Sequence, residues 1–233
     1  MSSRTPEVVL RIELLYRWCW TRKPEVFWYV VREASLWRAQ QVRWFVRMVV
    51  VTHLLSGNTG IGLALAASVF GYDCVICIAE TQSEEKKQTL TNFGAYLMQV
   101  PAVPYKNDNN YVHVAKRLSE AIASRTGVRA FYANQWDNHA NLNAHYSGTG
   151  PEIYEQLNGK IDAFSCAMGT GGTLTGTASY LKEQNPDIKI ALTDPRGSAL
   201  YRYFRDGELR SEGSSITEGI GQGRITGNME GTL

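Results

Sequence analysis

Glycine, asparagine and aspartate do not occur in the first 56 residues of this 233-residue chain, although the whole sequence has 21 glycines. Turns are built mainly from these three residue types, from serine and from proline. The segment has only two prolines, Pro6 and Pro24. Because an ordinary small domain needs turns, residues 1–55 are expected to differ in kind from the rest of the chain.

The chain also has few cysteines, a small net charge and no long apolar run. Four cysteines are too few for a disulfide scaffold, which favours a reducing compartment. A formal charge of +2 gives no reason to expect nucleic acid as a partner. No apolar run is long enough to span a membrane. With 44% hydrophobic and 20% charged residues, the composition is typical of a soluble globular protein.

Residues 1–55 are rich in tryptophan and arginine instead. They hold five of the six tryptophans and a net charge of +5. Three interpretations are open: a basic membrane or targeting segment, a helical appendage, and an aberrant stretch that is mistranslated or misassembled. Four glutamates in the segment argue against a transit peptide. We favour the third interpretation, in which residues 1–55 are an aberrant or non-native N-terminal segment.

From Ser56 onward, predicted helices and strands alternate. Gly71 and Gly94 are expected to end helices, and Ser83 is expected to cap one. Such alternation implies a mostly parallel sheet covered on both faces, with ligands at the carboxyl ends of the strands. The predicted helices are 60–70, 84–93, 112–124 and 174–184, with further helices in 138–157. The predicted strands are 74–79, 95–100, 129–133, 161–168 and 188–193.

A glycine-rich loop follows the predicted strand 161–168 and opens the next helix; it consists of Gly169, Thr170, Gly171, Gly172 and Thr173. Glycine lets backbone N–H groups approach an anion, and the helix N-terminus and two hydroxyls add to the attraction. The loop is neither a Walker loop, since no Gly-Lys-Ser/Thr follows, nor a dinucleotide fingerprint after the first strand. On its own it fits either a phosphate-binding loop or a tight turn.

A second polar loop, residues 56–60, reads Ser-Gly-Asn-Thr-Gly and also opens a predicted helix. It fits either a site for an anion such as a substrate carboxylate, or a polar helix cap. Two anion loops on one α/β chain indicate a ligand that carries a phosphate and a carboxylate. An amino acid joined to pyridoxal phosphate meets that description.

Motifs in one order along the chain resemble the cysteine synthase (O-acetylserine sulfhydrylase) branch of the pyridoxal-phosphate enzymes. Cystathionine β-synthase shares most of them, whereas tryptophan synthase β and threonine synthase are more distant. The resemblance covers residues 55–231. The motifs lie at residues 56–64, 133–136, 149–153, 169–173 and 217–221.

The resemblance implies the two-lobed α/β fold of type II pyridoxal-phosphate enzymes, with mostly parallel sheets, incomplete at both ends. Residues 56–145 would form a smaller lobe with the substrate-carboxylate loop, and residues 146–233 part of a larger lobe with the phosphate loop. The implied reaction makes cysteine and acetate from O-acetylserine and sulfide by β-elimination and addition. A homodimer is expected for the intact family. The expected compartment is the cytoplasm, with the mitochondrion left open because the native N-terminus is expected to be missing.

The resemblance also assigns roles to individual residues. Asn58 would bind the phenolic oxygen of the cofactor ring, and the glycine-rich loop would bind its phosphate. The cofactor positions are Asn58, Gly169, Thr170, Gly171, Gly172 and Thr173. The positions for the amino-acid substrate, including the mouth of the active site, are Ser56, Gly57, Thr59, Gln135 and Gly219.

The catalytic lysine is not assigned. The family's Schiff-base lysine lies in a Ser-x-Lys-Asp/Asn-Arg motif before the asparagine loop, and this chain has only Lys23 upstream, followed by Pro24. The alternatives are therefore a catalytically dead homologue or gene-model fragment that binds at most a phosphate ligand, and a cystathionine β-synthase-type replacement reaction.

No metal site is expected. Cys74 and Cys77 have a metal-like spacing but fall on a strand, where residues three apart face opposite sides, so they are expected to pack in the core. His113, His139 and His145 are expected to be ordinary surface or core histidines on helices.

Overall fold

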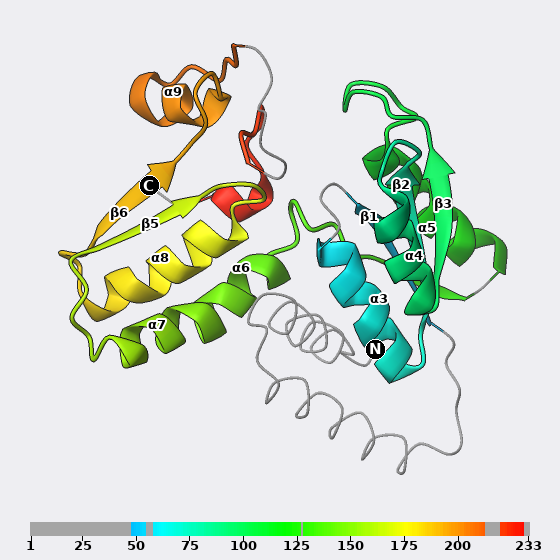
Figure 1. The fold of residues 1–233 in the computed structure, drawn as a ribbon, viewed down its shortest axis with the longest axis horizontal. Helices are drawn as coiled ribbons and strands as arrows, with labels where there is room; N and C mark the ends of the chain where they lie inside the picture. The colour runs from blue at the N-terminus through cyan, green and yellow to red at the C-terminus, as the bar shows by residue number, and fades with distance from the viewer. Residues whose placement is uncertain (1–47, 55–57, 127, 213–219, 231–233) are drawn as a thin grey trace. The chain divides into compact units, whose positions relative to one another are not determined.

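The computed structural model describes residues 48–54, 58–126, 128–212 and 220–230 (Figure 1). In this part of the chain, one compact unit ends at Asn134 and a second begins at Gln135. The sequence pattern predicts the second lobe from residue 146, whereas the structure assigns residues 135–145 to it as well. Lys23, Ser56, Gly57 and Gly219 lie outside the described residues.

The first unit contains a four-stranded parallel sheet in the order β3-β2-β1-β4. Its strands are β1 (Met48–Leu54), β2 (Asp73–Ala79), β3 (Ala95–Val100) and β4 (Arg129–Tyr132). In β1, Val51 pairs with Val75 on one side and with Tyr132 on the other. The parallel register brings the carboxyl ends of all four strands to one edge.

Strand β1 corrects the prediction that the aberrant segment extends to residue 55. Residues 48–54 form an inner strand of the sheet, between β2 and β4. The three consecutive valines of Val49–Val51 favour a buried parallel strand. The strand was not predicted because residues 1–55 were judged together by their unusual composition.

Helices cover both faces of the first sheet. They are α3 (Asn58–Phe70), α4 (Glu84–Asn92) and α5 (Tyr111–Thr126). Ala64 of α3 and Leu90 of α4 pack with Ile76 on one face. Ala115 of α5 packs with Cys77 on the other. For this sheet, the prediction of parallel strands covered on both faces is confirmed.

The two cysteines of β2 are core residues, as predicted. Cys74 packs in the cluster on the α3 and α4 face, and Cys77 packs in the cluster on the α5 face. Burial raises the pKa of each thiol to about 12, so both remain protonated at neutral pH. Within the described residues, no group of three or more histidine, cysteine or acidic side chains could hold a metal ion.

The second unit has a two-stranded parallel sheet with a helical layer. The strands are β5 (Ala163–Ala167) and β6 (Lys189–Thr193), connected by α8 (Gly172–Gln184). α8 packs against a continuous helical stretch whose middle turn is a π-helix (Figure 1). This stretch consists of α6 (Ala140–Ala144), η1 (His145–Thr149) and α7 (Gly150–Gln156).

Two short helices complete the second unit. α9 (Ala199–Asp206) follows β6, and the 3₁₀ helix η2 (Gly227–Met229) contacts α8. Met229 of η2 and Leu200 of α9 pack in one core cluster with Met168 and Leu174 at the two sides of the glycine-rich loop. Among the described helices, none is both long and apolar enough to cross a membrane.

Candidate phosphate-binding site at the start of helix α8

The glycine-rich loop connects β5 to α8, as the sequence predicts, and its glycines are required by packing. Gly171 caps α8 with a φ of +92°, a left-handed conformation that side chains strongly disfavour. A Cβ there would lie 2.6 Å from Cγ of Met229. A Cβ on Gly172 would overlap the side-chain amide of Asn141. Both glycines therefore allow neighbouring segments to close tightly around the loop.

The N-terminus of α8 is suited to an anion. The first N–H groups of any helix lack intrahelical acceptors, and Gly171 has no side chain to cap them. The first helical hydrogen bond joins the N–H of Thr175 to the carbonyl of Gly171, at 2.9 Å. No acidic residue lies in the first turn, so the positive end of the helix dipole is not offset there.

Both threonines of the loop are held by neighbouring side chains. Nδ2 of Asn141 donates to Oγ1 of Thr170 at 2.8 Å, and the hydroxyl of Thr226 donates to the Thr170 carbonyl at 2.6 Å. Oγ1 of Thr173 lies 3.1 Å from Nε2 of His145. Because Oγ1 of Thr170 is an acceptor in its contact with Asn141, its hydroxyl hydrogen can be donated to a ligand.

Gln135 is joined to the same loop through a buried asparagine. Nδ2 of Asn141 donates both to the Gln135 carbonyl, at 3.0 Å, and to Thr170. Asn228 of η2 donates to the carbonyls of Gln135 and Trp136, at 3.0 and 2.7 Å. The structure therefore brings together one predicted substrate residue and the predicted phosphate loop.

His145 is a core histidine, one of the two positions expected for it, and two threonines hydrogen-bond to its ring. Its side chain is buried between Thr173 and Thr149, and its Nδ1 lies 2.9 Å from Oγ1 of Thr149. Burial lowers the pKa of His145 to about 4, so the ring is neutral at neutral pH. The sequence does contain a signal, because Gly172 and Gly176 lie one turn apart on α8. That spacing indicates that another helix passes close by.

The remaining predicted residues of the described chain lie in the first unit. Asn58 and Thr59 begin α3, the first described element after β1. Asn134 follows β4 and has a φ of +41°, which is uncommon for a residue with a side chain. Since β1 and β4 are parallel neighbours, the carboxyl ends of the strands that precede Asn58 and Asn134 lie at the same edge of the first sheet.

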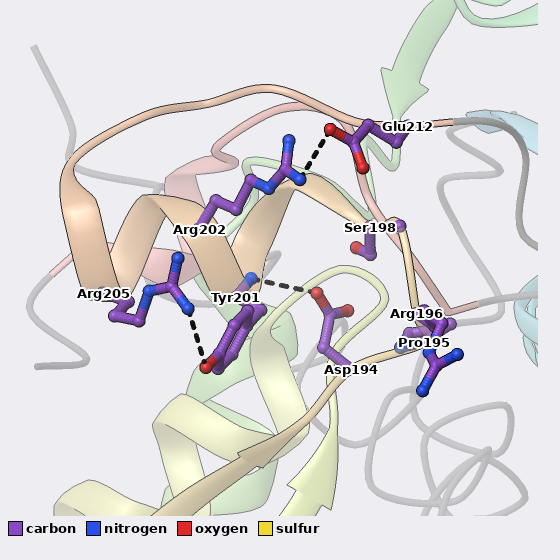
Figure 2. Close-up of a pocket in the computed structure, with 9 residues that line it drawn as sticks. Asp194, Pro195, Arg196, Ser198, Tyr201, Arg202, Arg205 and Glu212 are labelled. Atoms are coloured by element: carbon purple, nitrogen blue, oxygen red, sulfur yellow. Dashed lines mark hydrogen bonds and ion pairs between the residues drawn. The ribbon is translucent and has the colours of Figure 1, made fainter.

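A separate pocket of about 430 Å³ lies after β6, and Figure 2 shows its lining. The Tyr201 N–H donates to Oδ2 of Asp194 at 3.0 Å, and Arg202 pairs with Glu212 at 2.6 Å. None of the predicted cofactor or substrate residues lines it. The lining residues are Asp194, Pro195, Arg196, Gly197, Ser198, Tyr201, Arg202, Arg205 and Glu212.

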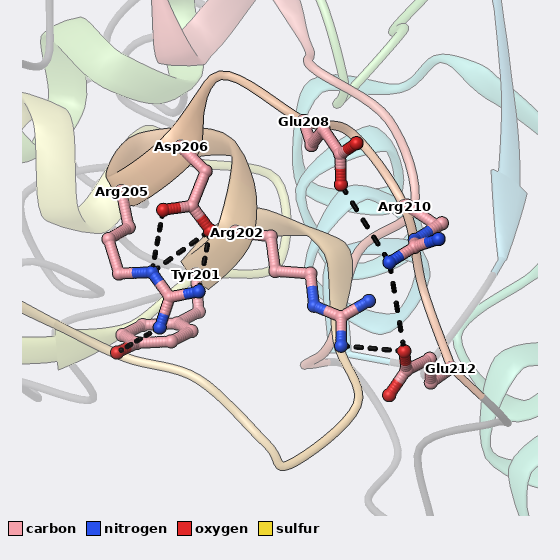
Figure 3. A network of polar contacts seen from close by, with 7 residues as sticks. All are labelled: Tyr201, Arg202, Arg205, Asp206, Glu208, Arg210 and Glu212. Carbon is pink, nitrogen blue, oxygen red and sulfur yellow. Dashed lines mark hydrogen bonds and ion pairs between the residues drawn. The ribbon is translucent and has the colours of Figure 1, made fainter.

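Among the ion pairs in Figure 3, the pair of Arg202 with Glu212 connects α9 to the chain that follows it, whereas Arg205 and Asp206 pair within α9. The Arg205 guanidinium pairs with Asp206 at 2.6 Å, and its hydrogen bonds lower the pKa of that carboxyl. Arg202 has the same effect on the pKa of Glu212. We interpret this cluster as a structural link on the surface, because its arginines are matched by nearby carboxylates.

Comparison with known proteins shows which family has this fold and this glycine-rich loop. Residues 33–232 match the family described as pyridoxal-phosphate dependent enzymes. The chain belongs to this family. The match begins inside the segment predicted to be aberrant, in agreement with the position of β1 in the sheet. The predicted α/β fold and the resemblance to cysteine synthases are confirmed.

Individual relatives point to the same branch. Cysteine synthase 1 of Neurospora crassa is 49% identical over 178 residues, which cover 75% of this chain and 46% of that protein. Cystathionine beta-synthase of Apis mellifera is 42% identical over 146 residues, covering 62% of this chain and 28% of that one. The chain thus spans about half the length of this cysteine synthase and a smaller share of the cystathionine beta-synthase.

A solved structure shares the fold. A hydrogen sulfide-producing enzyme from Fusobacterium nucleatum superposes with a TM-score of 0.64 and 28% identity. The superposition covers 88% of this chain and 64% of that one. The family relationship therefore extends from the short motifs to the arrangement of helices and strands.

Proposed function

We propose that the chain binds pyridoxal 5′-phosphate and is of the cysteine synthase type, whose intact members make cysteine and acetate from O-acetylserine and sulfide. The observation that carries the proposal is the phosphate loop. Two threonine side chains, fixed by Asn141 and His145, lie at a helix N-terminus whose Gly171 cap has no side chain. The 49% identity with a cysteine synthase supports the choice of reaction.

The residues of the second unit fit the phosphate of this cofactor. A phosphate ester needs several hydrogen-bond donors and a positive field, and the first turn of α8 offers both. The N–H groups of residues 172–174 and the hydroxyls of Thr170 and Thr173 would bind its oxygens. When bound, the cofactor supplies an electron sink that makes the substrate Cα proton acidic and lets a group on Cβ leave.

The other predicted roles follow the division into two units. We propose that the unit ending at Asn134 carries the substrate loop, where Asn58 would bind the cofactor ring oxygen and Thr59 the substrate carboxylate. Gln135, in the second unit, keeps its predicted role in binding the substrate carboxylate as a proposal. Ser56, Gly57 and Gly219 keep their predicted substrate roles as proposals. We also propose a homodimer, in the cytoplasm or the mitochondrion, with a small amino acid and sulfide as substrates.

Cofactor binding tests this proposal. Thr170→Val and Thr173→Val keep the side-chain shape but remove a donor to a charged group, so each should weaken pyridoxal 5′-phosphate binding about 10-fold or more. Thr193→Val, on the exposed side of β6, is the matched control and should bind as the parent does. Equilibrium dialysis measures the affinities. Equal affinity in all four proteins would refute the assignment of the loop.

Turnover is a separate question, because the family chemistry needs a lysine that bonds to the cofactor. Lys23 lacks the family's flanking residues, so we predict no cysteine formation above background and no lysine–cofactor linkage trapped by borohydride at a unique site. Trapping at Lys23, with turnover abolished by Lys23→Ala, would instead establish a full enzyme.

Cystathionine synthesis is the second candidate reaction, and the 42% identity with a cystathionine beta-synthase favours it. Supplying serine with homocysteine, in parallel with O-acetylserine and sulfide, distinguishes the two. Formation of cystathionine alone would replace the first assignment.

A further inference from the structure

The ion pairs of α9 match only part of the charge around the pocket that follows β6. Asp194 and Arg196, two residues apart on its lining, take part in none of the ion pairs of the described residues. Oδ2 of Asp194 accepts the backbone N–H of Tyr201 at 3.0 Å, whereas Oδ1 is buried without a hydrogen-bond partner in the described chain. The pocket therefore carries one negative and one positive side chain that nothing in it neutralises.

Ser198 leaves a second polar group of the lining unsatisfied. It is the N-cap residue of α9, has an extended backbone with a φ of −68°, and is 9% exposed. A serine at this position usually accepts a hydrogen bond from the N–H group two or three residues further on. Here Asp194 accepts from the third of these, Tyr201, and the Ser198 hydroxyl has no partner within the described residues. A hydroxyl that a neighbouring carboxylate has displaced from capping is left for a ligand.

The unsatisfied groups specify the chemistry of that ligand. Figure 2 shows the Asp194 and Ser198 side chains pointing toward one another in the pocket. Both can accept, and an ammonium group supplies three N–H donors. Arg196 lines the same pocket with an exposed side chain, and a guanidinium binds a carboxylate through two parallel hydrogen bonds. Because Asp194 and Arg196 are so close in the chain, the two charges of the ligand must also be close together.

We propose that this pocket binds an α-amino acid, whose ammonium group donates to Asp194 and Ser198 and whose carboxylate binds to Arg196. The pocket volume of about 430 Å³ lies within the range of small-molecule sites. None of the residues assigned to the cofactor or to the substrate lines this pocket. It is therefore an amino-acid site in addition to the proposed substrate site, and it does not depend on the proposed function.

Binding of L-alanine to the full chain, without pyridoxal 5′-phosphate, tests the charges of the ligand. L-Alanine has both charges and only a methyl side chain, so a site that recognises α-amino acids by their charges must bind it. L-Lactate has a hydroxyl in place of the ammonium group, and L-alaninamide has a neutral amide in place of the carboxylate. Saturation-transfer NMR titrations should show each analogue binding at least about 10-fold more weakly than L-alanine. Equal affinity for either analogue would overturn the inference.

Substitutions of the two charged residues test the location. Asp194→Asn retains an acceptor for the helix N–H but loses the charge, and Arg196→Gln removes the guanidinium. Each should weaken L-alanine binding about 10-fold. Asp187→Asn and Arg210→Gln are the matched controls, because these exposed side chains do not line the pocket, and both should bind as the parent does. Parent-like affinity in Asp194→Asn and Arg196→Gln would refute the site.

Ser198→Ala separates binding from folding. The Ser198 hydroxyl has no partner in the free chain, so its removal should leave the melting temperature unchanged while it weakens L-alanine binding by at least about 3-fold. A lower melting temperature with unchanged affinity would show a structural role instead and would overturn the contact proposed for Ser198.

The outcomes are independent of the proposed function, which is read from binding of pyridoxal 5′-phosphate. If the parent chain does not bind L-alanine, only the amino-acid pocket is refuted. If Thr59→Val abolishes L-alanine binding and Asp194→Asn retains it, the amino acid binds at the proposed substrate loop, and the pocket is again refuted. Circular dichroism identifies any variant that unfolds. The comparison of L-alanine with its two analogues on the parent chain then decides the question.

Discussion

The two sheets of the described chain differ in how they are buried. In the first unit, β2 is covered on both faces: Ile76 and Cys77 point to opposite sides and are both fully buried. In the second unit, β5 and β6 have an exposed side, where Ser165 and Thr193 hydrogen-bond at 2.9 Å. The packing of the second unit lies mainly on the other side of its sheet, between α8 and the helices α6, η1 and α7.

This difference shows what supports each proposed binding loop. Asn58 and Thr59 extend from the carboxyl edge of a sheet with a two-sided core. The loop from Gly169 to Thr173 depends instead on helix packing and on buried side chains from three segments. Substitutions within a sheet should therefore matter most in the first unit, and substitutions between helices should matter most in the second.

The largest expected effect is on the first sheet. Ile76→Ala leaves a cavity between β2 and its covering helices, which should lower the free energy of unfolding of the first unit by about 2–5 kcal/mol. Thr193→Ala, on the exposed side of the second sheet, should change stability by no more than about 0.5 kcal/mol. Hydrogen exchange read by mass spectrometry assigns each effect to a unit. Similar losses for both variants would refute the contrast.

Acid should act on the second unit through His145. Its pKa is about 4 in the folded chain, below the ordinary value of 6.5, so the unfolded chain binds the proton more readily. The stabilisation is complete above pH 6.5 and is lost as pH falls through 4, by up to about 3 kcal/mol. Hydrogen exchange of peptides from η1 and α8, measured from pH 7 to 4, tests this after correction for the intrinsic rate. A His145→Gln variant with the same pH dependence would contradict it.

A smaller loss is expected at the helix contact. Gly176→Ala places a methyl group against the Leu142 carbonyl and His145, which should cost about 1–3 kcal/mol through displacement of η1 from α8. Gly223→Ala is the control, because a Cβ there meets nothing within 4 Å. Thermal unfolding and exchange in η1 measure both. Parent-like exchange in Gly176→Ala would show that the two helices can separate without cost.

The elements that the sequence predicts are those with strong local signals. Strand 95–100 is observed with the same bounds, and Ser83 caps α4 by accepting from the N–H of Lys86. Apolar periodicity and turn residues carry this information within a few positions. The inner strand β1 was missed because its valines lie in a segment of unusual composition. α9 has no predicted counterpart, although Leu200 and Phe204, one turn apart, pack in the core of the second unit.

The candidate phosphate site was predicted in part for the same reason, and its role stays a proposal. A glycine-rich loop after a strand is a local pattern, so residues 169–173 could be found from the sequence. The side chains that hold the loop come from distant positions: Asn141 is 29 residues from Thr170, and Thr226 is 56 residues away. Which asparagine or histidine reaches the loop depends on how α6, η1 and η2 pack, and spacing in the sequence does not encode that.

The contacts of η2 and the residue before it determine when the glycine-rich loop is held in place during protein synthesis. Asn228 binds the Gln135 carbonyl across 93 residues, and Thr226 fastens the Thr170 carbonyl. Contacts of such long range form late in folding, because the intervening chain loses entropy first. On the ribosome, the loop and α8 are made well before residues 226–228 emerge. The nascent chain therefore carries an unfastened glycine-rich loop until residues 226–228 have emerged, and binding of the proposed cofactor is expected to follow that step.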